Sequence, residues 1–366
     1  MNKDKQSLAL QPGGLRSFRK NPWAACCLIL LGVFYAGALL ADLVSPYSYQ
    51  NEDRNYSYCP PMTIHVLDEQ GRLTRPFVYG VTITFDEYHK RTYAINPEEK
   101  YPLKFWVQGD SYQFLGLIPA SRHLFGVDAP GRLMLWGADA RGRDLFSRIV
   151  YGGRVSLSIG LLGVAISFSI GLLVGGIAGY YGGRIDDILM RICEMFMMIP
   201  GFYLLLALRA MVPADFNSVQ VYFSIVVILS FIGWASLARI IRGMCLSIRE
   251  REFVLAAKVM GLSDFRIIVR HILPHTLSYS IIAIMLSIPG YILAESALSL
   301  IGLGIQDPYA SWGNLLSEAM GIIQINFSPW ILLPGFFIFL AVMCFNVIGD
   351  TLRDCLDPHF RVDDTM

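Results

Sequence analysis

The sequence contains few charged residues. Asp, Glu, Lys and Arg make up only 16% of its 366 residues, whereas hydrophobic residues make up 54%. Soluble globular domains carry about 25% charged residues, so this composition excludes an ordinary soluble domain and indicates a membrane protein. The formal net charge is only +1, which does not indicate nucleic-acid binding.

Cysteines are also few, and their positions do not suit a disulfide framework. Of the seven cysteines, only Cys59 lies in a segment that we expect outside the cell. The others fall in apolar runs or in segments expected inside the cell. Disulfides persist in oxidising compartments, and a single external cysteine has no internal partner there. The cysteine count therefore excludes a framework of internal disulfides.

Familiar catalytic motifs are missing. The chain has no H-E-x-x-H pattern, no G-K-[ST] nucleotide loop and no nucleophile elbow. His271 and His275 lie close together, but no cysteine or carboxylate accompanies them in a metal-ligand pattern. We therefore expect them to be surface or packing residues. We expect no enzyme activity, no metal site and no cofactor bound by this chain.

Long apolar runs are abundant. A helix needs about 20 apolar residues to cross a bilayer, and we identify six candidate spans. They cover residues 23–44, 155–180, 188–211, 219–238, 276–300 and 330–348. Ala36 and Ala38 also resemble a signal-peptide cleavage site, but the first run is longer than a usual signal-peptide core of about 7–15 residues. We favour an uncleaved first span.

Glycine and proline mark special positions within the spans. Gly171, Gly175 and Gly179 repeat the G-x-x-x-G spacing, which allows two helix backbones to approach closely. Pro200-Gly201 should kink the third span, and Pro289-Gly290 should interrupt the fifth. A phosphate-binding loop is a poor alternative for the glycines, because no strand precedes them.

The distribution of basic residues predicts the topology. The short connections 212–218 and 301–329 contain no Lys or Arg. The connections that alternate with them, and the C-terminal tail, hold Arg184, Arg239, Arg242, Arg249, Arg251, Lys258, Arg266, Arg270, Arg353 and Arg361. Short basic loops stay in the cytoplasm. We therefore predict a multi-pass protein of the inner (plasma) membrane with both termini cytoplasmic.

These observations divide the chain into five parts. We expect a cytoplasmic tail over 1–22, a first transmembrane helix over 23–44 and an external insertion over 45–150. A five-helix core over 151–349, with an inner loop at 239–275, precedes a cytoplasmic tail over 350–366. The fold class is an all-α integral membrane protein with six transmembrane helices and an external α+β insertion. In the insertion we predict β-strands, a turn at 68–71, and a helix along the membrane surface over 138–157.

Three ionisable residues lie within the predicted spans. Glu194, Arg209 and Glu295 would each cost about 2.5–3.5 kcal/mol at the bilayer centre, so each should face protein or water. The two glutamates either line a translocation path or form hydrogen bonds between helices, and both readings remain open. Arg209 lies near the outer end of its span, so we expect its side chain to reach the outer interface and keep its charge in water.

A basic amphipathic stretch, EFVLAAKVMGLSDFRIIVRHILP, occupies residues 252–274. Its helical spacing puts Phe253, Ala256, Ala257 and Met260 on one face. Gly261 suits a left-handed helix end, and a second short helix can begin after it. The stretch is either a solvated connection or a docking element for a cytoplasmic partner. Its length and its apolar face favour docking.

The pattern LAAKVMG…HILP in this stretch resembles the cytoplasmic EAA loop of ABC-importer permeases. More specifically, the chain resembles the second permease subunit of oligopeptide, dipeptide and nickel importers. Three further blocks support the resemblance: GRDLFSRIVYGGRVSL at 142–157, LAESALSLIGLGIQDPYASWGNLL at 293–316 and FNVIGDTLRDCLDP at 345–358. Leu255 stands where the family usually has Glu, and His275 stands where Asn is common.

The resemblance implies a non-enzymatic transport subunit in the membrane lipid. It would form a heterodimer with a second homologous permease. Two cytoplasmic ATP-binding subunits would use the ATP, and an external substrate-binding protein would deliver the cargo. The implied ATPase-coupling residues are Phe253, Leu255, Ala256, Ala257, Met260, Gly261 and Pro274.

The cargo and the energy source are less closely defined by the resemblance. Peptides are the favoured cargo, and nickel or another small solute is the alternative. An ion-coupled secondary transporter is the alternative mechanism, with a midplane site at the two Pro-Gly breaks.

Overall fold

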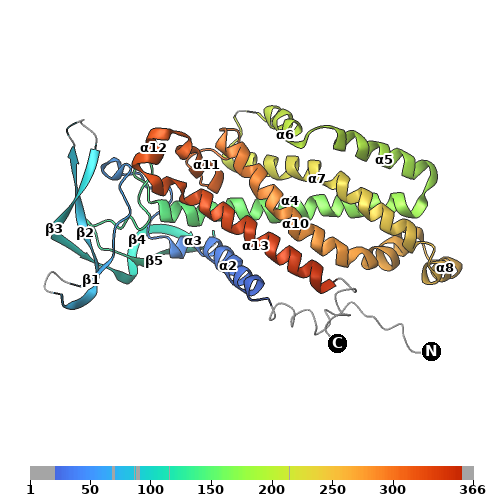
Figure 1. Cartoon of the computed structure of the whole chain (residues 1–366), viewed down its shortest axis with the longest axis horizontal. Helices are drawn as coiled ribbons and strands as arrows, with labels where there is room; N and C mark the ends of the chain where they lie inside the picture. Colours follow the sequence, from blue (N-terminus) through green and yellow to red (C-terminus); the bar gives the residue numbers. More distant parts are fainter. Residues whose placement is uncertain are drawn as a thin grey trace.

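The computed structural model describes residues 21–67, 71–85, 87, 91–114, 116–213 and 215–356. The predicted N-terminal tail up to residue 20, turn residues 68–70 and the C-terminal tail from residue 357 lie outside the described residues. The molecule is elongated, with a helical bundle along most of its length and the strands gathered at one end (Figure 1). We refer to these as the strand end and, opposite, the α8 end.

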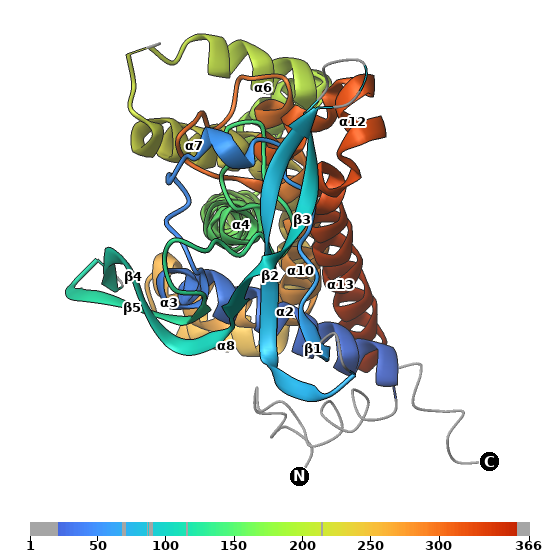
Figure 2. The same cartoon turned by 90° about the vertical axis from the view of Figure 1, so that its left-hand side faces the viewer.

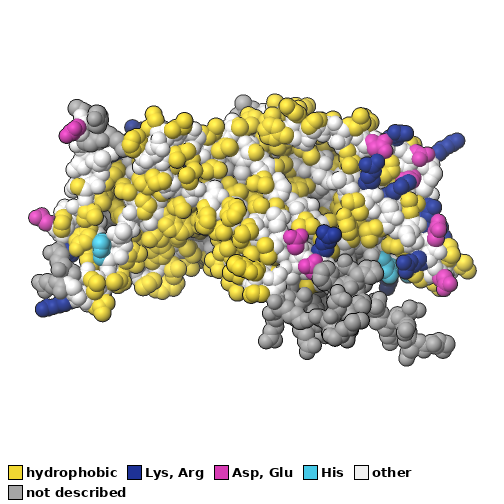
Figure 3. Space-filling model, in the orientation of Figure 1, with side chains coloured by type: hydrophobic (Ala, Val, Ile, Leu, Met, Phe, Trp, Pro, Cys, Tyr) yellow, Lys and Arg dark blue, Asp and Glu magenta, His cyan; other side chains and the backbone are white. Residues whose placement is uncertain are grey.

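Five long helices form the bundle. They are α2 (Pro22–Leu39), α4 (Leu145–Tyr181), α7 (Ser218–Ile248), α10 (Leu273–Leu300) and α13 (Leu333–Leu356). Within the described residues, these five helices are long and apolar enough to cross a membrane. Figure 3 shows apolar side chains across the middle of the visible face, with most of the charged side chains toward the two ends. The composition of the bundle surface therefore suits lipid.

A bent pair of shorter helices replaces the predicted third span. Helices α5 (Gly183–Met198) and α6 (Gly201–Ala210) meet at an angle of 87°, and together they are the candidate for a sixth span. Pro200 lies between them and has no backbone N–H to continue the helix. The predicted kink at Pro200-Gly201 is confirmed.

The predicted interruption at Pro289-Gly290 is wrong. Helix α10 continues through Pro289 without a break. Ile288 and Ile292, on either side of the proline, are fully buried in a core shared with α4 and α13. Packing by neighbouring helices lets a membrane helix tolerate the missing backbone hydrogen bond.

Two helix boundaries differ from the prediction and shorten the connections. Residues 138–144 form a turn, and α4 begins at Leu145, so only 145–157 of the predicted surface helix over 138–157 is helical, and it is the start of the long helix α4. Asp144 caps α4, because its Oδ2 accepts from the Ser147 N–H at 2.8 Å and from the Ser147 hydroxyl at 2.6 Å. At the α8 end, α7 extends to Ile248, so less of the 239–275 segment is loop than predicted.

The G-x-x-x-G glycines of α4 pack against α7. A Cβ atom on Gly175 would lie 2.4 Å from the carbonyl oxygen of Ala238, and one on Gly179 would lie 2.5 Å from Cβ of Cys245. A Cβ on Gly171 would lie 3.0 Å from the carbonyl oxygen of Trp234. Only glycine permits this approach, so the predicted close packing is confirmed.

The insertion contains the predicted strands. A short helix α3 (Ala41–Val44) and a 3₁₀ turn η1 (Arg54–Tyr56) precede them. The strands β1 (His65–Leu67), β2 (Leu73–Phe85) and β3 (Arg91–Pro102) form an antiparallel sheet, and β4 (Lys104–Phe114) pairs with β5 (Ile118–Gly126). Figure 2 shows the two sheets as separate ribbons beside the end of α4. Val78 of β2 is buried in one cluster with Val127 and Leu133, which follow β5.

Short helices complete each end of the bundle. At the strand end lie α11 (Trp312–Ser317), η3 (Glu318–Met320), α12 (Ile322–Phe327) and η4 (Pro329–Leu332). At the opposite end lie α8 (Glu252–Val259), α9 (Asp264–Ile267) and a π-helical turn η2 (Ile268–Ile272). The Trp312 indole is buried and donates to the carbonyl oxygen of Ile149 at 2.9 Å, which fastens α11 to α4.

Candidate functional site

The segment from α8 to η2 is a compact helical tip. Gly261 has φ +75°, a left-handed conformation that glycine adopts without a steric penalty. Its N–H donates to the carbonyl of Lys258 at 3.0 Å, and the Leu262 N–H donates to the carbonyl of Ala257 at 3.2 Å. This pair of bonds is the Schellman arrangement that ends a helix and turns the chain. The predicted turn at Gly261 is confirmed.

Apolar side chains are exposed on this tip. Val259 is 88% exposed, and Met260 and Phe265 are each 70% exposed. Phe253, Leu255 and Ala256 are also exposed. The surface formed by these six residues is the α8 surface below. Monomeric soluble surfaces seldom keep such a group of large apolar side chains without a partner.

One part of the predicted apolar face is wrong. Ala257 is fully buried, together with Val254, against Ile241 and Cys245 of α7. Both residues lie on the side of α8 that packs on the bundle, whereas Phe253, Ala256 and Met260 lie on the exposed side. The helical spacing was correct, but it could not say which residues the protein's own helices would cover.

The tip is attached to two of the long helices. The Tyr180 hydroxyl, at the end of α4, donates to Oδ1 of Asp264 at 2.6 Å, and Lys258 Nζ lies 4.8 Å from the centroid of the Tyr180 ring. On the other side, the rings of Phe253 and His275 are 4.9 Å apart. Pro274 and His275 lie in the first turn of α10. A force on α8 would therefore reach both α4 and α10.

The two glutamates of the predicted spans have different environments. Glu194 on α5 is partly exposed and pairs with Arg191 at 2.9 Å and with Arg239 of α7 at 3.6 Å. Glu295 is fully buried. Its oxygens accept from the hydroxyls of Ser156 at 3.1 Å and Ser299 at 2.7 Å. The hydrogen bonds of Glu295 thus connect α10 with α4.

Arg209 lies near the end of α6, as expected for a residue at the edge of a span. Its Nε donates to the carbonyl oxygen of Leu303 at 2.5 Å. This bond attaches α6 to the connection that follows α10.

A cavity of about 510 Å³ lies between α4, α7 and α10 in the middle of the bundle. None of its described lining residues is charged. Its polar groups are hydroxyls, and they belong to Ser167, Ser236, Tyr279, Ser287 and Tyr291. The sequence did not indicate this site, because isolated serines and tyrosines in apolar runs have no distinctive spacing.

A buried ionic cluster lies at the strand end of α4. Asp139 accepts from Arg143 Nε at 2.6 Å and also from Arg148 Nη1. Arg143 Nη1 and Arg148 Nη2 both donate to Oδ1 of Asp307, at 3.0 Å and 2.8 Å. Glu318 lies beside both arginines. These residues join the insertion, α4 and the segment after α10.

The charges of this cluster affect the pKa values of its carboxyl groups. Burial opposes ionisation of Asp307, yet the guanidinium groups of Arg148 and Arg143 hold its pKa below the ordinary value. Burial dominates for Glu318 and raises its pKa. The sequence analysis did not single out this cluster, although two of the blocks that carried the resemblance contain Arg143, Arg148 and Asp307.

Comparison with known proteins identifies the family. Residues 171–362, more than half of the chain, match the family described as "Binding-protein-dependent transport system inner membrane component". The chain belongs to this family. It is therefore a multi-pass protein of the inner membrane, as the sequence predicted. Residues 14–61 also match the "N-terminal TM domain of oligopeptide transport permease C".

Curated relatives support the same family. The chain is 42% identical over 187 residues to the dipeptide transport system permease protein DppC of Bacillus subtilis. It is 44% identical over 188 residues to the oligopeptide transport system permease protein OppC of Haemophilus influenzae. Each match covers 51% of this chain, and the chain spans 57% and 58% of these relatives.

Among solved structures, the chain is similar to one described as "Inward facing conformations of the MetNI methionine ABC transporter". The TM-score is 0.43 at 19% sequence identity, and the match covers 58% of this chain and 97% of that chain.

Proposed function

We propose that this chain is a permease subunit of an ATP-driven importer whose cargo is peptide. The observation that carries the proposal is the α8 surface. Its apolar residues stay exposed among the described residues, and the segment behind it is attached to α4 and, through Phe253 and His275, to α10. An apolar helix in a groove of an ATPase subunit would transmit nucleotide-driven movement to the spans.

The proposal assigns an orientation. The α8 end and both termini face the cytoplasm, and the strand end faces outward. Support comes from the arginines between α7 and α10, which contrast with the Lys- and Arg-free connections 212–218 and 301–329. The chain would pair with a second homologous permease, and an external binding protein would deliver cargo to the strand end. No cofactor is assigned to this chain, because the ATP would be bound by the ATPase subunits.

We assign the coupling contact to Phe253, Leu255, Ala256, Met260 and Gly261. Ala257 and Pro274 would act behind this contact, because Ala257 packs inward and Pro274 begins α10. Leu255 replaces the usual carboxylate of the family pattern with an exposed apolar side chain. The ATPase groove would therefore be less basic at this point than in relatives with Glu.

The hydroxyl-lined cavity between α4, α7 and α10 is our candidate for this chain's share of the translocation path. A neutral, hydroxyl-lined wall can exchange hydrogen bonds with peptide groups without holding a charge tightly. Glu194 lies on the bent α5–α6 pair and remains a second candidate. For Glu295 we propose a packing role, because its burial and its two serine partners suit hydrogen bonding between helices.

The alternatives are less well supported. A secondary transporter would form its midplane site at two broken helices. One of the two predicted breaks is absent, because α10 is continuous through Pro289. An importer for nickel or another small solute would use the same α8 surface, so the cargo assignment depends on the names of the peptide permeases to which the chain is similar.

The test is peptide uptake by the complete transporter carrying Met260→Asp. Met260 is exposed, so the substitution should leave the fold intact while placing a charge in an apolar contact. We expect normal amounts of the subunit in the membrane and loss of ATP-dependent uptake of a radiolabelled tripeptide. Leu73→Asp, at an 84% exposed position on β2, is the matched control and should retain uptake.

Normal uptake by Met260→Asp would contradict the coupling role. Uptake by the unmodified transporter that survives ATP depletion but stops when ion gradients collapse would instead establish the secondary-transporter mechanism.

A further inference from the structure

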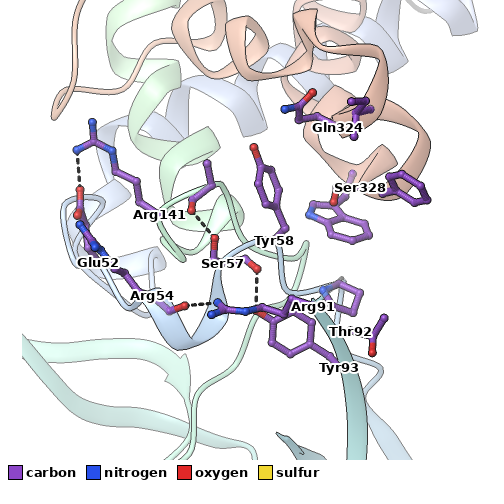
Figure 4. Close-up of a pocket in the computed structure, with 15 residues that line it drawn as sticks. Glu52, Arg54, Ser57, Tyr58, Arg91, Thr92, Tyr93, Arg141, Gln324 and Ser328 are labelled. Atoms are coloured by element: carbon purple, nitrogen blue, oxygen red, sulfur yellow. Dashed lines mark hydrogen bonds and ion pairs between the residues drawn. The ribbon is translucent and has the colours of Figure 1, made fainter. Parts of the chain in front are cut away.

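A large cavity lies between the insertion and the helices that follow α11. Its volume is about 1050 Å³, somewhat above the range of roughly 300–1,000 Å³ that is usual for small-molecule sites. One wall comes from the insertion, around η1 and the start of β3, and the opposite wall comes from α12 and η4 (Figure 4). Neither the family resemblance nor the relatives explain this cavity.

The cavity contains two arginines whose charges no described carboxylate neutralises. Arg54 and Arg91 both line it, and no carboxylate among the described residues forms an ion pair with either. Arg91 Nη1 donates to the backbone carbonyl of Arg54 at 2.5 Å, which fixes the position of the Arg91 guanidinium. The third arginine of the lining, Arg141, differs because it pairs with Glu52 at 2.9 Å. Within the part of the chain that the structure describes, the guanidinium groups of Arg54 and Arg91 therefore lack a carboxylate partner and can bind an anion.

Tyr58 is held in an unfavourable conformation at the centre of this site. Its φ is +54°, which costs energy for a residue with a side chain and persists only where neighbours enforce it. Its N–H donates to the carbonyl of Asp139 at 2.9 Å, and the adjacent Ser57 hydroxyl donates to the carbonyl of Ala140. Figure 4 shows the Tyr58 ring projecting into the cavity toward Gln324. No described residue forms a hydrogen bond with its hydroxyl.

Aromatic rings that are fixed in place form much of the remaining wall. The Tyr93 hydroxyl donates to the carbonyl of Ser57 at 2.6 Å, and the Trp330 indole donates to the carbonyl of Ala138 at 3.0 Å. Both rings therefore have their polar atoms occupied and present apolar surface to the cavity. The site combines cationic donors and apolar rings with two polar groups, the Tyr58 hydroxyl and the Gln324 amide, for which the described residues offer no hydrogen-bond partner.

We propose that this cavity binds the C-terminal end of a peptide, with Arg54 and Arg91 holding its free carboxylate. A carboxylate suits guanidinium donors, the aromatic walls suit the last side chain, and the Tyr58 hydroxyl and Gln324 amide suit the peptide backbone. The inference rests on the proposed function for the outward orientation of this end and for peptide as cargo. It adds a holding site on the insertion itself, ahead of the translocation path.

The test measures peptide binding to the complete transporter in lipid nanodiscs without a substrate-binding protein. The probes are tritiated Ala-Ala-Phe and the same tripeptide with a C-terminal amide, compared by equilibrium dialysis. We expect the amide to bind about tenfold more weakly, because it loses charge-assisted hydrogen bonds. Arg54→Ala and Arg91→Ala should weaken binding of the acid by a similar factor and leave binding of the amide unchanged.

Arg75→Ala is the matched control, because Arg75 is exposed on β2 and does not line the cavity. It should bind both probes like the unmodified transporter. Arg54 is exposed, and its side chain forms no hydrogen bond or ion pair with the residues that the structure describes, so its variant should fold normally. The comparison of the acid with the amide needs no substitution.

Equal binding of the acid and the amide, or absence of binding, would overturn the inference. Tripeptide binding that is unaffected by Arg54→Ala and Arg91→Ala would also overturn it. If the two substitutions instead weaken association of a peptide-free binding protein, the cavity takes an acidic protein loop, and the inference is again wrong. Normal peptide uptake alongside any of these results would refute this inference alone. Failure of peptide uptake by the unmodified transporter would refute the proposed function.

Discussion

Arg148 Nη2 and Asp307 Oδ1 lie 2.8 Å apart, although 159 residues separate them in the chain. Arg148 is fully buried in the first turns of α4, and Asp307 belongs to the connection that follows α10. Asp139, also fully buried, holds the same arginine from the insertion side. This contact ties the insertion to the helical core at the strand end.

The first prediction concerns the buried carboxylate of this cluster. Asp139→Asn would leave the guanidinium groups of Arg143 and Arg148 with one fewer negative partner. Breaking a buried pair in this way typically costs about 3–5 kcal/mol. We expect a clear fall in the thermal unfolding temperature of the detergent-solubilised protein.

Asp128→Asn is the control for that experiment, because Asp128 and its partner Lys104 are each more than half exposed. An exposed pair contributes at most about 1 kcal/mol, so the unfolding temperature should hardly change. Equal effects of the two substitutions would show that the cluster does not stabilise the fold.

The second prediction concerns pH. Burial raises the pKa of Asp144 from its ordinary value of 3.8 to about 6, and its Oδ1 has no hydrogen-bond partner among the described residues. The folded state therefore holds this proton more tightly than the unfolded state. Stability should fall as pH rises from about 4 to about 6, by about 3 kcal/mol for a shift of this size. Above about pH 6 this loss of stability is complete.

Asp144→Asn should remove this part of the pH dependence. The carboxyl of Glu318, whose pKa is also raised, changes stability in the same direction, so the comparison is between the variant and the unmodified protein at each pH. Asp307 has a lowered pKa, and its contribution is lost only as pH falls below about 4. Identical unfolding curves for the two proteins between pH 4 and 7 would contradict the prediction.

The third prediction concerns the α4–α7 contact. Gly175→Ala would place a methyl group 2.4 Å from the carbonyl oxygen of Ala238, so the helices would have to separate. Overpacking of this kind costs about 1–3 kcal/mol. We expect a lower unfolding temperature and less folded protein in the membrane.

Gly243→Ala on α7 is the matched control, because nothing lies within 4 Å of its added Cβ. It should be neutral or stabilise the protein by up to about 1 kcal/mol through a less flexible unfolded chain. If Gly175→Ala behaved in the same way, close contact of the two backbones would be excluded.

The fourth prediction concerns transmission from α8 to α4. Tyr180→Phe removes the hydroxyl that donates to Asp264 but keeps the ring beneath Lys258. The net loss is about 1 kcal/mol, enough to loosen the segment without unfolding the protein. We expect more ATP to be hydrolysed for each peptide imported into proteoliposomes. Tyr203→Phe, at an exposed position on α6, should leave this ratio unchanged.

The periodic parts of the chain were predictable, and the positions that depend on neighbours were not. Runs of about 20 apolar residues predicted the spans, because lipid requires length and hydrophobicity, which are local properties. The kink at Pro200 followed from a missing backbone donor. At Pro289 the same reasoning failed, because Ile288 and Ile292 are packed on both sides and keep α10 continuous.

The α8 surface shows the same limit at a finer scale. Spacing placed Phe253, Ala256, Ala257 and Met260 near one another on a helix. Only packing against α7 decided that Ala257 faces inward while Met260 faces solvent. An alanine is small enough for either side, so its identity carries little information about its partner.

The sequence by itself determined that this is a membrane protein of several spans, where its helices approach closely, and where a glycine ends α8. Each of these follows from properties of neighbouring residues along the chain. Only the tertiary structure decided that Arg143 and Arg148 share Asp139 and Asp307, and that Arg54 and Arg91 share a cavity with α12. Those groups come from segments far apart in sequence. Charge pairs and cavities depend on distances in space, which no local pattern encodes.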